Sequence, residues 1–424
     1  ELVDLLKHLP SSGVGPDRRG AGLYRRLAFQ VADLIPGLLD HAGSEVAPED
    51  EERLIADLAS AGIDMVAYIF YIIKRYLGQS ARGAWIFRAR DTRPISVLPT
   101  IVRILQRVIG KILTRAIEPD LPACFHAWTA RGRIDDAVID FNTWVQTLAH
   151  TRRVGLGFLL DLAAAFPNAS WDALRHILTR LEFPAHAVRA ISRLGQGIRH
   201  TAVWERRERV GPDAVDGLGQ GAGDSPGLLL LLIWVVWSYL EEGQEYDRML
   251  YPDDCYTELE QSWFADDGLG MADIERIDDD GLKKAQGLLI RYNRAFDKVL
   301  RATGQRINLE KTEVLLTMRL TTADFDRLRA VFDAEGWHNV SLVYEVKHLG
   351  VWQGPDVTGG RIWRDAIAKA IARVGLWRKG AWGRNVMAII WRVFIVTLFS
   401  YLGRFHSYPA HAHTELNQML YQAA

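Results

Sequence analysis

Cysteine is nearly absent from this chain of 424 residues. Only Cys124 and Cys255 occur, so neither a disulfide framework nor a Cys/His zinc site can be built from them. Their scarcity favours a reducing, intracellular compartment. The sequence opens on Glu1 without a signal-peptide pattern, so we expect a fragment or a processed product. It also contains no internal repeat and no low-complexity stretch.

Long hydrophobic runs are missing too. The apolar run over 227–237 is shorter than the roughly 20 residues that a membrane-spanning helix needs. The run over 386–402 is longer but carries Arg392 in its middle. We therefore expect both runs to be buried helices, and we expect no membrane partner. With 49% hydrophobic and 24% charged residues, the composition is that of a globular protein.

Net charge is also small, −1 at pH 7, which by itself argues against a nucleic-acid partner. Its distribution along the chain argues for one. The segments 74–115 and 361–404 are rich in Lys and Arg, and each contains a single acidic residue, Asp91 and Asp365 respectively. Acidic residues gather over 241–280. This pattern suits a cleft that binds a polyanion on its walls and metal ions on its floor, although solvated helix faces would give the same pattern.

Apolar periodicity predicts the secondary structure. Residues 1–80 have helical spacing, and an amphipathic helix is expected over 101–117. A short buried strand over 157–160 ends at Asp161, and Asn168 or Ser170 can cap the helix that follows it. The remaining expected elements are a strand at 85–87, a hairpin arm at 203–210, a long helix at 282–300, strand-like segments at 307–316 and 343–351, and basic helices from 361 to about 420.

Three aspartates suggest a metal site. Asp161 follows an apolar strand, while Asp266 and Asp267 precede Gly268 in a predicted turn between two further strands. Adjacent residues of a regular strand point to opposite faces, so this pair must lie in a turn for both carboxylates to face one cleft. Few protein carboxylates are needed to hold two Mg²⁺ ions about 3.5–4 Å apart, because phosphates and water complete the octahedral coordination. A solvated loop is the alternative.

Seven short blocks occur in a fixed order over about residues 85–355. They are Arg93-Pro94-Ile95-Ser96, Arg131-Gly132-Arg133 with Asp135-Asp136, Asp161-Leu162-Ala163-Ala164-Ala165-Phe166, Gly219-Gln220-Gly221 with Ser225-Pro226, Phe264-Ala265-Asp266-Asp267, Gly304 with Ile307-Asn308-Leu309 and Lys311-Thr312, and His348-Leu349-Gly350-Val351. The ordered set resembles a reverse transcriptase, an RNA-directed DNA polymerase, closest to those of non-LTR retrotransposons and group II introns.

The resemblance implies an α+β fold of the right-hand polymerase kind. A helical N-terminal extension would occupy residues 1–80 and the fingers 81–155. The palm, with a ferredoxin-like or RRM-like mixed sheet, would span 156–360 and include fingers insertions over about 167–215. A basic helical thumb would follow over 361–424.

The resemblance also implies roles in catalysis. Asp161 and Asp266 would be the main ligands of two Mg²⁺ ions, for which Mn²⁺ could substitute. Leu162 would add its backbone carbonyl, and Asp267 would lie at the edge of the metal site but contribute to its charge. Lys311 would protonate the departing pyrophosphate or offset its charge.

Nucleotide binding is assigned in the same way. Arg93 would bind the incoming triphosphate, since a guanidinium matches phosphate oxygens. Gln220 and Gly221 would approach the sugar or the edge of the base pair. The ring of Phe166 would clash with a 2′-hydroxyl group and so select deoxynucleotides.

Leu349 and Gly350 resemble the primer grip and would place the primer end. The implied partners are an RNA template, a DNA or RNA primer and deoxynucleoside triphosphates, whereas protein partners are not predicted. Three alternatives stay open, of which one is an inactive relic of a decayed element. An RNA-dependent RNA polymerase usually has an aspartate where Phe166 stands, and a catalytically idle RNA-binding or splicing-helper protein usually loses palm aspartates. Gly219 replaces an arginine found in many relatives, which puts primer handling in doubt.

Overall fold

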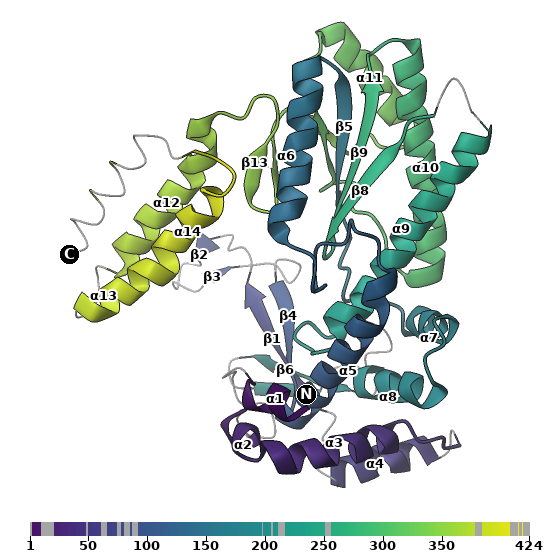
Figure 1. The fold of residues 1–424 in the computed structure, drawn as a ribbon, viewed down its shortest axis with the longest axis vertical. Coiled ribbons are helices and arrows are strands. Elements are labelled where there is room, and N and C mark those ends of the chain that lie inside the picture. The colour runs from purple at the N-terminus through teal and green to yellow at the C-terminus, as the bar shows by residue number, and fades with distance from the viewer. Residues whose placement is uncertain are drawn as a thin grey trace. The chain divides into compact units, whose positions relative to one another are not determined.

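The chain forms two compact units in the computed structural model (Figure 1). The first unit comprises 1–131, 162–243 and 292–307, and the second comprises 132–161, 244–291 and 308–424. The structure describes residues 2–9, 21–47, 50–60, 66–73, 78–79, 85–86, 92–196, 198–204, 207–210, 217–250, 256–377, 384–407, 414 and 418. Two long helices, α9 (Ser225–Leu250) and α10 (Asp279–Thr303), each contribute residues to both units.

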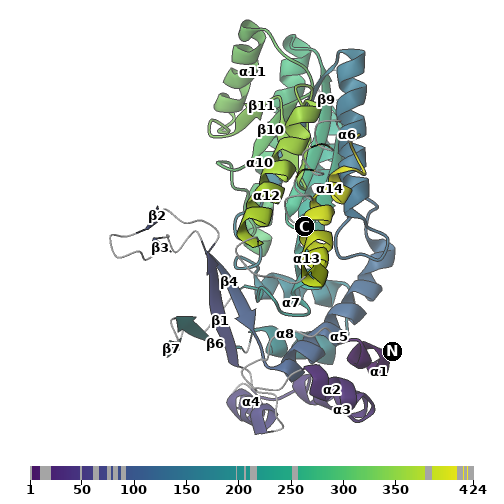
Figure 2. The ribbon, with the colours of Figure 1, turned by 90° about the vertical axis from the view of Figure 1, so that its left-hand side faces the viewer.

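Helices and a four-stranded sheet make up the first unit. Its sheet has the order β4-β1-β6-β7, in which β1 (Val66–Ile73) pairs antiparallel with β4 (Thr92–Val97) and parallel with β6 (Arg199–Trp204). Figure 2 shows this sheet from the side. The other elements are α1 (Leu2–Lys7), α2 (Ala21–Arg26), α3 (Ala28–Ala42), α4 (Glu51–Ser60), β2 (Gly78–Gln79), β3 (Trp85–Ile86), α5 (Thr100–Ile117), η3 (Glu118–Asp120), α7 (Trp171–Arg180), α8 (Ala185–Gln196) and β7 (Arg207–Val210).

The prediction of helices throughout 1–80 is wrong at β1. Residues Val66–Ile73 read Val-Ala-Tyr-Ile-Phe-Tyr-Ile-Ile, a run of β-branched and aromatic side chains that favours a strand. Pairing with strands on both sides satisfies the backbone of β1. Among the described residues of 1–80, the helical prediction holds for α1 to α4 and is wrong for β1 and β2.

Two helices, α5 and α9, contribute long buried stretches to the apolar core of the first unit. Eleven residues of the amphipathic α5 are buried, and Gln106 within it donates to the Leu194 carbonyl of α8. The start of α9 is buried all round from Leu228 to Ile233. By length and composition, Ser225–Tyr246 is apolar enough to cross a membrane, but half of its apolar stretch is buried in the structure. A core helix has the same properties.

A five-stranded mixed sheet forms the centre of the second unit. Its order is β11-β10-β5-β9-β8, and β5 (Val154–Asp161) runs antiparallel to both β9 (Asp267–Glu275) and β10 (Glu313–Leu316). The edge strands are β8 (Leu259–Phe264) and β11 (Ser341–Val343), and β11 is parallel to β10. The mixed α+β content that we expected is therefore present, whereas the division into fingers, palm and thumb stays a prediction.

Helices pack on both faces of this sheet (Figure 1). On one face α6 (Ile134–Thr151) buries Phe141 and Val145 against Leu269, Met271 and Leu315. On the other face lies α11 (Thr322–Ala334), and the rings of its Phe332 and of Trp337, which follows the helix, contact Phe158 of β5. These two apolar layers hold β5 and β9 in register.

The C-terminal part of the second unit is a hairpin followed by helices. The hairpin pairs β12 (Val346–His348) with β13 (Val351–Gln353). The helices are α12 (Gly359–Trp377), α13 (Arg384–Ile390), the π-helix η4 (Trp391–Val396) and α14 (Thr397–Leu402). Residues 386–402 are helical as predicted.

The prediction that residues 386–402 are buried is only partly right. Ile395, Phe399 and Leu402 pack against α12, while Ile389 is 63% exposed and Val393 is 50% exposed. The physical reason is that this segment is apolar around much of its circumference, but α12 covers only one stripe of it.

Candidate active site

Asp161 and Asp267 stand opposite each other in neighbouring strands of the second unit. Asp161 ends β5, Asp267 begins β9, and the two residues are Cα partners in the antiparallel ladder. Residues directly opposite each other in an antiparallel pair point to the same face of the sheet. The strand register therefore brings together two of the three predicted aspartates, although they are separated by more than a hundred positions in the sequence.

Asp266 lies in the tight turn between β8 and β9. Phe264 pairs with Asp267, so only Ala265 and Asp266 connect the two strands. Ala265 takes a positive φ of 59°, which two-residue hairpins require at the first central position. Asp266 is consequently held at the tip of the hairpin, next to the paired Asp161 and Asp267.

Gly268 has a different role from the one that we predicted. It does not form the turn, which depends on Ala265, but it lies under the buried ring of Trp263. A Cβ atom at position 268 would come within 2.5 Å of that ring. Trp263 is 1% exposed, and its Nε1 donates to Gln261. Glycine at position 268 thus leaves room for the Trp263 side chain of β8 to lie across β9.

The carboxylates of this site affect one another. Desolvation, together with the nearby charges of Asp266 and Asp161, raises the pKa of Asp267 to about 6. Negative charges this close favour either a proton or a cation. The electrostatics of the site therefore suit a bound metal ion.

Lys311 lies beside Asp161 because a turn from Asn308 to Thr312 is attached to the end of β5. The Asn308 amide donates to the Asp161 carbonyl at 2.8 Å, and the Lys311 amide donates to the Asn308 carbonyl at 3.1 Å. Buried Thr312 accepts from the Asp161 amide at 3.5 Å. This places the Lys311 Nζ atom 3.7 Å from Asp161 Oδ2, with the lysine side chain 68% exposed. The ammonium group of Lys311 is therefore accessible to a substrate.

The turn at Asn308 also corrects one predicted strand. The strand-like segment 307–316 is shortened to β10, because residues 308–312 form the turn. Leu162, the residue after Asp161, belongs to the first unit, where it is 4% exposed and forms an isolated β-bridge with Ile307.

The donor set fits magnesium. Within the described ranges, no three His, Cys, Asp or Glu side chains are close enough together to form a complete metal cage. Mg²⁺ does not need one, since it usually takes one or two carboxylates and completes its shell with water and substrate phosphates. The residues that would hold such ions are Asp161 and Asp266, with Asp267 adding negative charge.

Phe166 belongs to the first unit and lies in a fixed loop after Leu162. Its carbonyl accepts from the Leu218 amide at 2.7 Å. Its ring meets that of Trp128 edge to face. The sequence reasoning missed Trp128, although the residue lies three positions before the recognised Arg131 block.

Gly304 lets the neighbouring backbone pack closely against the loop that carries Phe166. Gly304 has a φ of +75°, and a Cβ atom there would come within 2.5 Å of the Asn168 carbonyl oxygen. Buried Gln305 donates to the Ala165 carbonyl at 3.0 Å. The Gly304 block thus supports the position of Phe166 within the first unit.

Gln220 and Gly221 pack against β4, also within the first unit. The Ser96 amide donates to the Gln220 carbonyl at 2.9 Å. Gly221 has a φ of +111°, and a Cβ atom there would come within 2.9 Å of the Ser96 oxygen. The backbone of Arg93 lies in the same strand, opposite Ile72, but its side chain lies outside the described residues.

Leu349 and Gly350 form the turn of the β12–β13 hairpin in the second unit. Both have positive φ, 47° and 88°. The Tyr401 hydroxyl of α14 donates to the Leu349 carbonyl at 2.8 Å. Desolvation and the nearby Asp135 carboxylate raise the pKa of Tyr401, so this hydroxyl stays protonated and keeps donating. Sequence reasoning missed Tyr401 because nothing in the sequence around it forms a motif.

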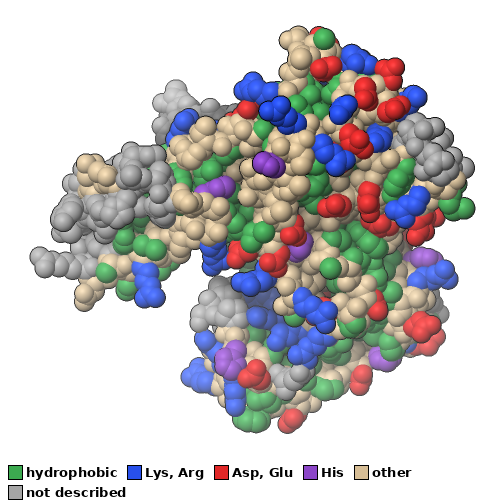
Figure 3. All heavy atoms as spheres, turned by 45° about the horizontal axis from the view of Figure 1, so that its top comes forward, with side chains coloured by type: hydrophobic (Ala, Val, Ile, Leu, Met, Phe, Trp, Pro, Cys, Tyr) green, Lys and Arg blue, Asp and Glu red, His purple; other side chains and the backbone are tan. Residues whose placement is uncertain are grey.

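The structure therefore assembles two sets of predicted residues. Asp161, Asp266, Asp267 and Lys311 come together in the second unit. Phe166 and the Gln220 loop are both anchored in the first unit, through Leu218 and Ser96. The face displayed in Figure 3 carries both acidic and basic side chains.

Comparison with known families identifies the family to which the chain belongs. The sequence model of the family described as reverse transcriptase (RNA-dependent DNA polymerase) matches residues 83–352, well over half of the chain. The chain belongs to the reverse transcriptase family. A search of curated proteins found no match. The matched range of this reverse transcriptase includes every predicted site residue, and membership implies a nucleotidyltransferase of the polymerase type.

Proposed function

We propose that this reverse transcriptase copies RNA into DNA by adding deoxynucleotides to a primer 3′ end, with two Mg²⁺ ions held by Asp161 and Asp266. The observation that carries the proposal is the cross-strand pairing of Asp161 with Asp267, with Asp266 in the two-residue turn beside them. Mn²⁺ would substitute for Mg²⁺, and the element of origin would be a retrotransposon or a related retroelement.

Residues of the chain next to the two ions would assist the reaction. When bound, the two ions would activate the primer 3′-hydroxyl group and bind the triphosphate. Lys311 would offset the charge of the departing pyrophosphate, which its exposed ammonium beside Asp161 supports. Leu162 would offer its backbone carbonyl to a metal ion, and Asp267 would add negative charge.

Substrate selection is proposed for the first unit. The ring of Phe166 would exclude a 2′-hydroxyl group, and its edge contact with Trp128 supports a fixed ring. Gln220 and Gly221 would approach the sugar or the base-pair edge, while Arg93 would bind the triphosphate. In the second unit, Leu349 and Gly350 would place the primer end.

Primer extension tests this function. With poly(rA)/oligo(dT) and dTTP, we expect extension with Mg²⁺ and none without it. Asp266→Asn should reduce extension by at least a hundredfold, on the order of other losses of transition-state charge stabilisation. Asp280→Asn, an exposed aspartate at the start of α10, is the matched control and should keep normal activity.

The rival functions give different results in the same assay. Preferred incorporation of UTP over dTTP would indicate an RNA-dependent RNA polymerase. Binding of the primed template without extension would indicate an idle RNA-binding protein. Full extension by folded Asp266→Asn would refute the metal assignment.

A further inference from the structure

Gln305 lies in the first unit, directly after Gly304, and its side chain is completely buried. Its Nε2 atom donates to the Ala165 carbonyl at 3.0 Å, while its backbone amide donates to the Thr303 hydroxyl at 3.2 Å. The reverse orientation of the carboxamide would place two oxygen atoms together, so the direction of the bond to Ala165 is settled. A side chain held from the end of α10 therefore fixes the backbone of the loop that carries Phe166.

Hydrogen bonds fix both of the peptide planes that flank Phe166. The Ala165 carbonyl lies in the same plane as the Phe166 amide, because the peptide bond between these residues is planar. Gln305 holds this plane, and the Leu218 amide holds the next one by donating to the Phe166 carbonyl at 2.7 Å. Two fixed planes define the φ and ψ angles of the residue between them, and hence the direction of its Cβ atom. The contact with Gln305 thus sets the direction in which the Phe166 ring leaves the backbone.

The Phe166 loop needs such contacts because it contains an unfavourable backbone conformation. Ala164 has a φ of 50°, which a residue with a Cβ atom rarely adopts unless its surroundings impose it. The Ala163 amide donates to the Arg306 carbonyl at 2.8 Å. Arg306 and Gln305 therefore hold the loop on both sides of Ala164, directly before Phe166.

Stability alone does not account for a glutamine at position 305. The Oε1 atom of Gln305 is buried and has no hydrogen-bond partner in the part of the chain that the structure describes. Leaving a buried acceptor unpaired costs free energy, whereas an apolar side chain of the same shape would be nearly neutral or stabilising. An unpaired buried group calls for another explanation, and the bond from Nε2 to the Ala165 carbonyl supplies one.

We propose that Gln305 is a positioning residue for sugar selection. By fixing the peptide plane before Phe166, it directs the phenylalanine ring to the place where a nucleotide 2′-hydroxyl group would lie. Because its side chain is completely buried, Gln305 acts through Phe166 and not by contact with the nucleotide. The proposal rests on the proposed polymerase function and deepens it, whereas the order of the loop is a property of the chain without substrate.

Gln305→Met tests the proposal, because methionine keeps the length and shape of the side chain but lacks the donor. The preference for dTTP over UTP, as the ratio of kcat/KM values in primer extension, should fall by about twofold to tenfold, the range expected for one lost hydrogen bond. Most of the fall should come from a higher kcat/KM for UTP. General damage to the fold would instead lower kcat/KM for both nucleotides.

Gln106→Met is the matched control for the chemical change. Gln106 is also completely buried in the first unit, and its Nε2 atom donates to a backbone carbonyl, that of Leu194, at 2.9 Å. Its Oε1 atom has no partner among the described residues either. The hydrogen bond of Gln106 joins α5 to α8 and not to the Phe166 loop, so Gln106→Met should keep the normal preference for dTTP.

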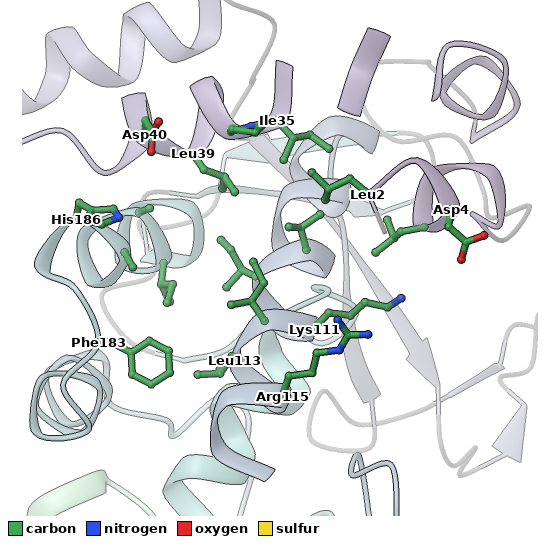
Figure 4. A pocket seen from close by; sticks show the side chains of 18 residues that line it. Leu2, Asp4, Ile35, Leu39, Asp40, Lys111, Leu113, Arg115, Phe183 and His186 are labelled. Carbon is green, nitrogen blue, oxygen red and sulfur yellow. The ribbon is translucent and has the colours of Figure 1, made fainter. Parts of the chain in front are cut away.

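Ile35→Ala is a second control, which separates lost stability from lost selection. Ile35 is 1% exposed and lines a pocket between α1, α3, α5 and α8, where Figure 4 shows its side chain. The described lining of this pocket includes no residue of 161–170 or 303–307. Ile35→Ala should lower the midpoint of urea unfolding, because it removes buried methyl groups, yet it should keep the preference for dTTP.

A double-mutant cycle shows whether Gln305 acts through the ring. Phe166→Ala alone should lower the preference for dTTP further than Gln305→Met does. Adding Gln305→Met to Phe166→Ala should change the ratio no further, since a positioning residue has no effect once the group that it positions is gone. Effects of the two substitutions that simply multiply would overturn the proposal.

Gln305→Glu is a second variant of the same size. A buried carboxyl group favours its neutral form, whose hydroxyl can donate to the Ala165 carbonyl. This variant should therefore keep more of the preference for dTTP than Gln305→Met, and it should lose that advantage as pH rises and the carboxyl group ionises. The same preference in both variants at every pH would mean that the hydrogen bond does not direct the ring.

Amide hydrogen exchange follows the loop without requiring catalysis. Gln305→Met should speed exchange in a peptide covering residues 162–170, whereas Gln106→Met should not. Unchanged exchange, or an unchanged preference in folded Gln305→Met while Phe166→Ala lowers it, would overturn the proposal. Absence of primer extension by the wild type would instead count against the proposed polymerase function, and the exchange rates would still decide whether Gln305 orders the loop.

Discussion

The rings of Trp128 and Phe166 meet edge to face, with centroids 6.2 Å apart and planes at 74°. Trp128 holds this position with a φ of 60°, a backbone conformation that is uncommon for a bulky residue and persists only where the surroundings impose it. The carbonyl of Phe166 is fixed at the same time by the Leu218 amide. Under the proposed function, a ring held in this way would act as a rigid steric gate, and Trp128 would be its positioning residue.

Trp128→Ala should loosen the discrimination between sugars. The edge-to-face contact is worth about 0.5–1.5 kcal/mol, so we expect preference for dTTP over UTP to fall by about twofold to tenfold, with a larger fall in Phe166→Ala. The ratio of kcat/KM values for the two nucleotides measures this. Trp128→Phe keeps an aromatic edge and should restore much of the preference. An unchanged ratio in folded Trp128→Ala would remove Trp128 from the selection mechanism.

Gly268→Ala should destabilise the second unit. Its Cβ atom would approach the buried Trp263 ring within 2.5 Å, and overpacking of this kind costs about 1–3 kcal/mol. Gly37→Ala is the control, and it should raise the free energy of unfolding. No atom lies within 4 Å of a Cβ atom there, and alanine is favoured over glycine inside a helix by about 0.5–1 kcal/mol. Urea unfolding of both variants measures the two shifts, and equal stability of Gly268→Ala and wild type would contradict the packing argument.

Tyr401→Phe should weaken primer handling. The substitution removes the hydrogen bond from the Tyr401 hydroxyl to the Leu349 carbonyl, which contributes about 0.5–1.5 kcal/mol. Because Leu349 is held at a positive φ of 47°, the hairpin turn should become less ordered. We expect KM for the primed template to rise while KM for dTTP stays close to normal. Tyr246→Phe, at a side chain that is 55% exposed, should alter neither value.

Asp224 should make stability depend on pH. Its side chain is 1% exposed, and desolvation raises its pKa to about 7 despite hydrogen bonds from its own amide and that of Ser225. Because the pKa in the folded state exceeds that in the unfolded state, the folded chain binds more protons between about pH 4 and pH 7. The contribution of this group to stability is therefore complete at low pH and is lost as pH rises toward 7, with no further loss above it.

Asp224→Asn isolates that contribution. The free energy of unfolding in urea, measured from pH 5 to pH 8, should fall less with pH in the variant than in the wild type. Asp280→Asn, at an exposed carboxylate, should follow the wild-type curve. Parallel curves for wild type and Asp224→Asn would mean that the buried carboxyl does not titrate in this range.

Several elements could be predicted because their signals are local. The spacing of apolar residues indicated α5 within one residue of its start, and Ser170, one of the two expected caps, accepts from the Ala173 amide at the start of α7. Asp161 ends a buried strand, as its neighbours indicated. The order of the motif blocks was also sufficient to suggest the family that the comparison confirmed. Each of these signals lies within a few residues of the feature it predicts.

Other features needed the folded chain. Residues 66–73 form a strand because two other strands pair with them, and residues 386–402 stay partly exposed because α12 covers only one stripe. Trp128 reaches Phe166, and Tyr401 reaches Leu349, through tertiary contacts that no local pattern encodes. The amino-acid order placed aspartates at the end of a strand and at the tip of a hairpin. Only the register of β5 against β9 put Asp161 opposite Asp267, since strand pairing over such a separation depends on the packing of the whole sheet.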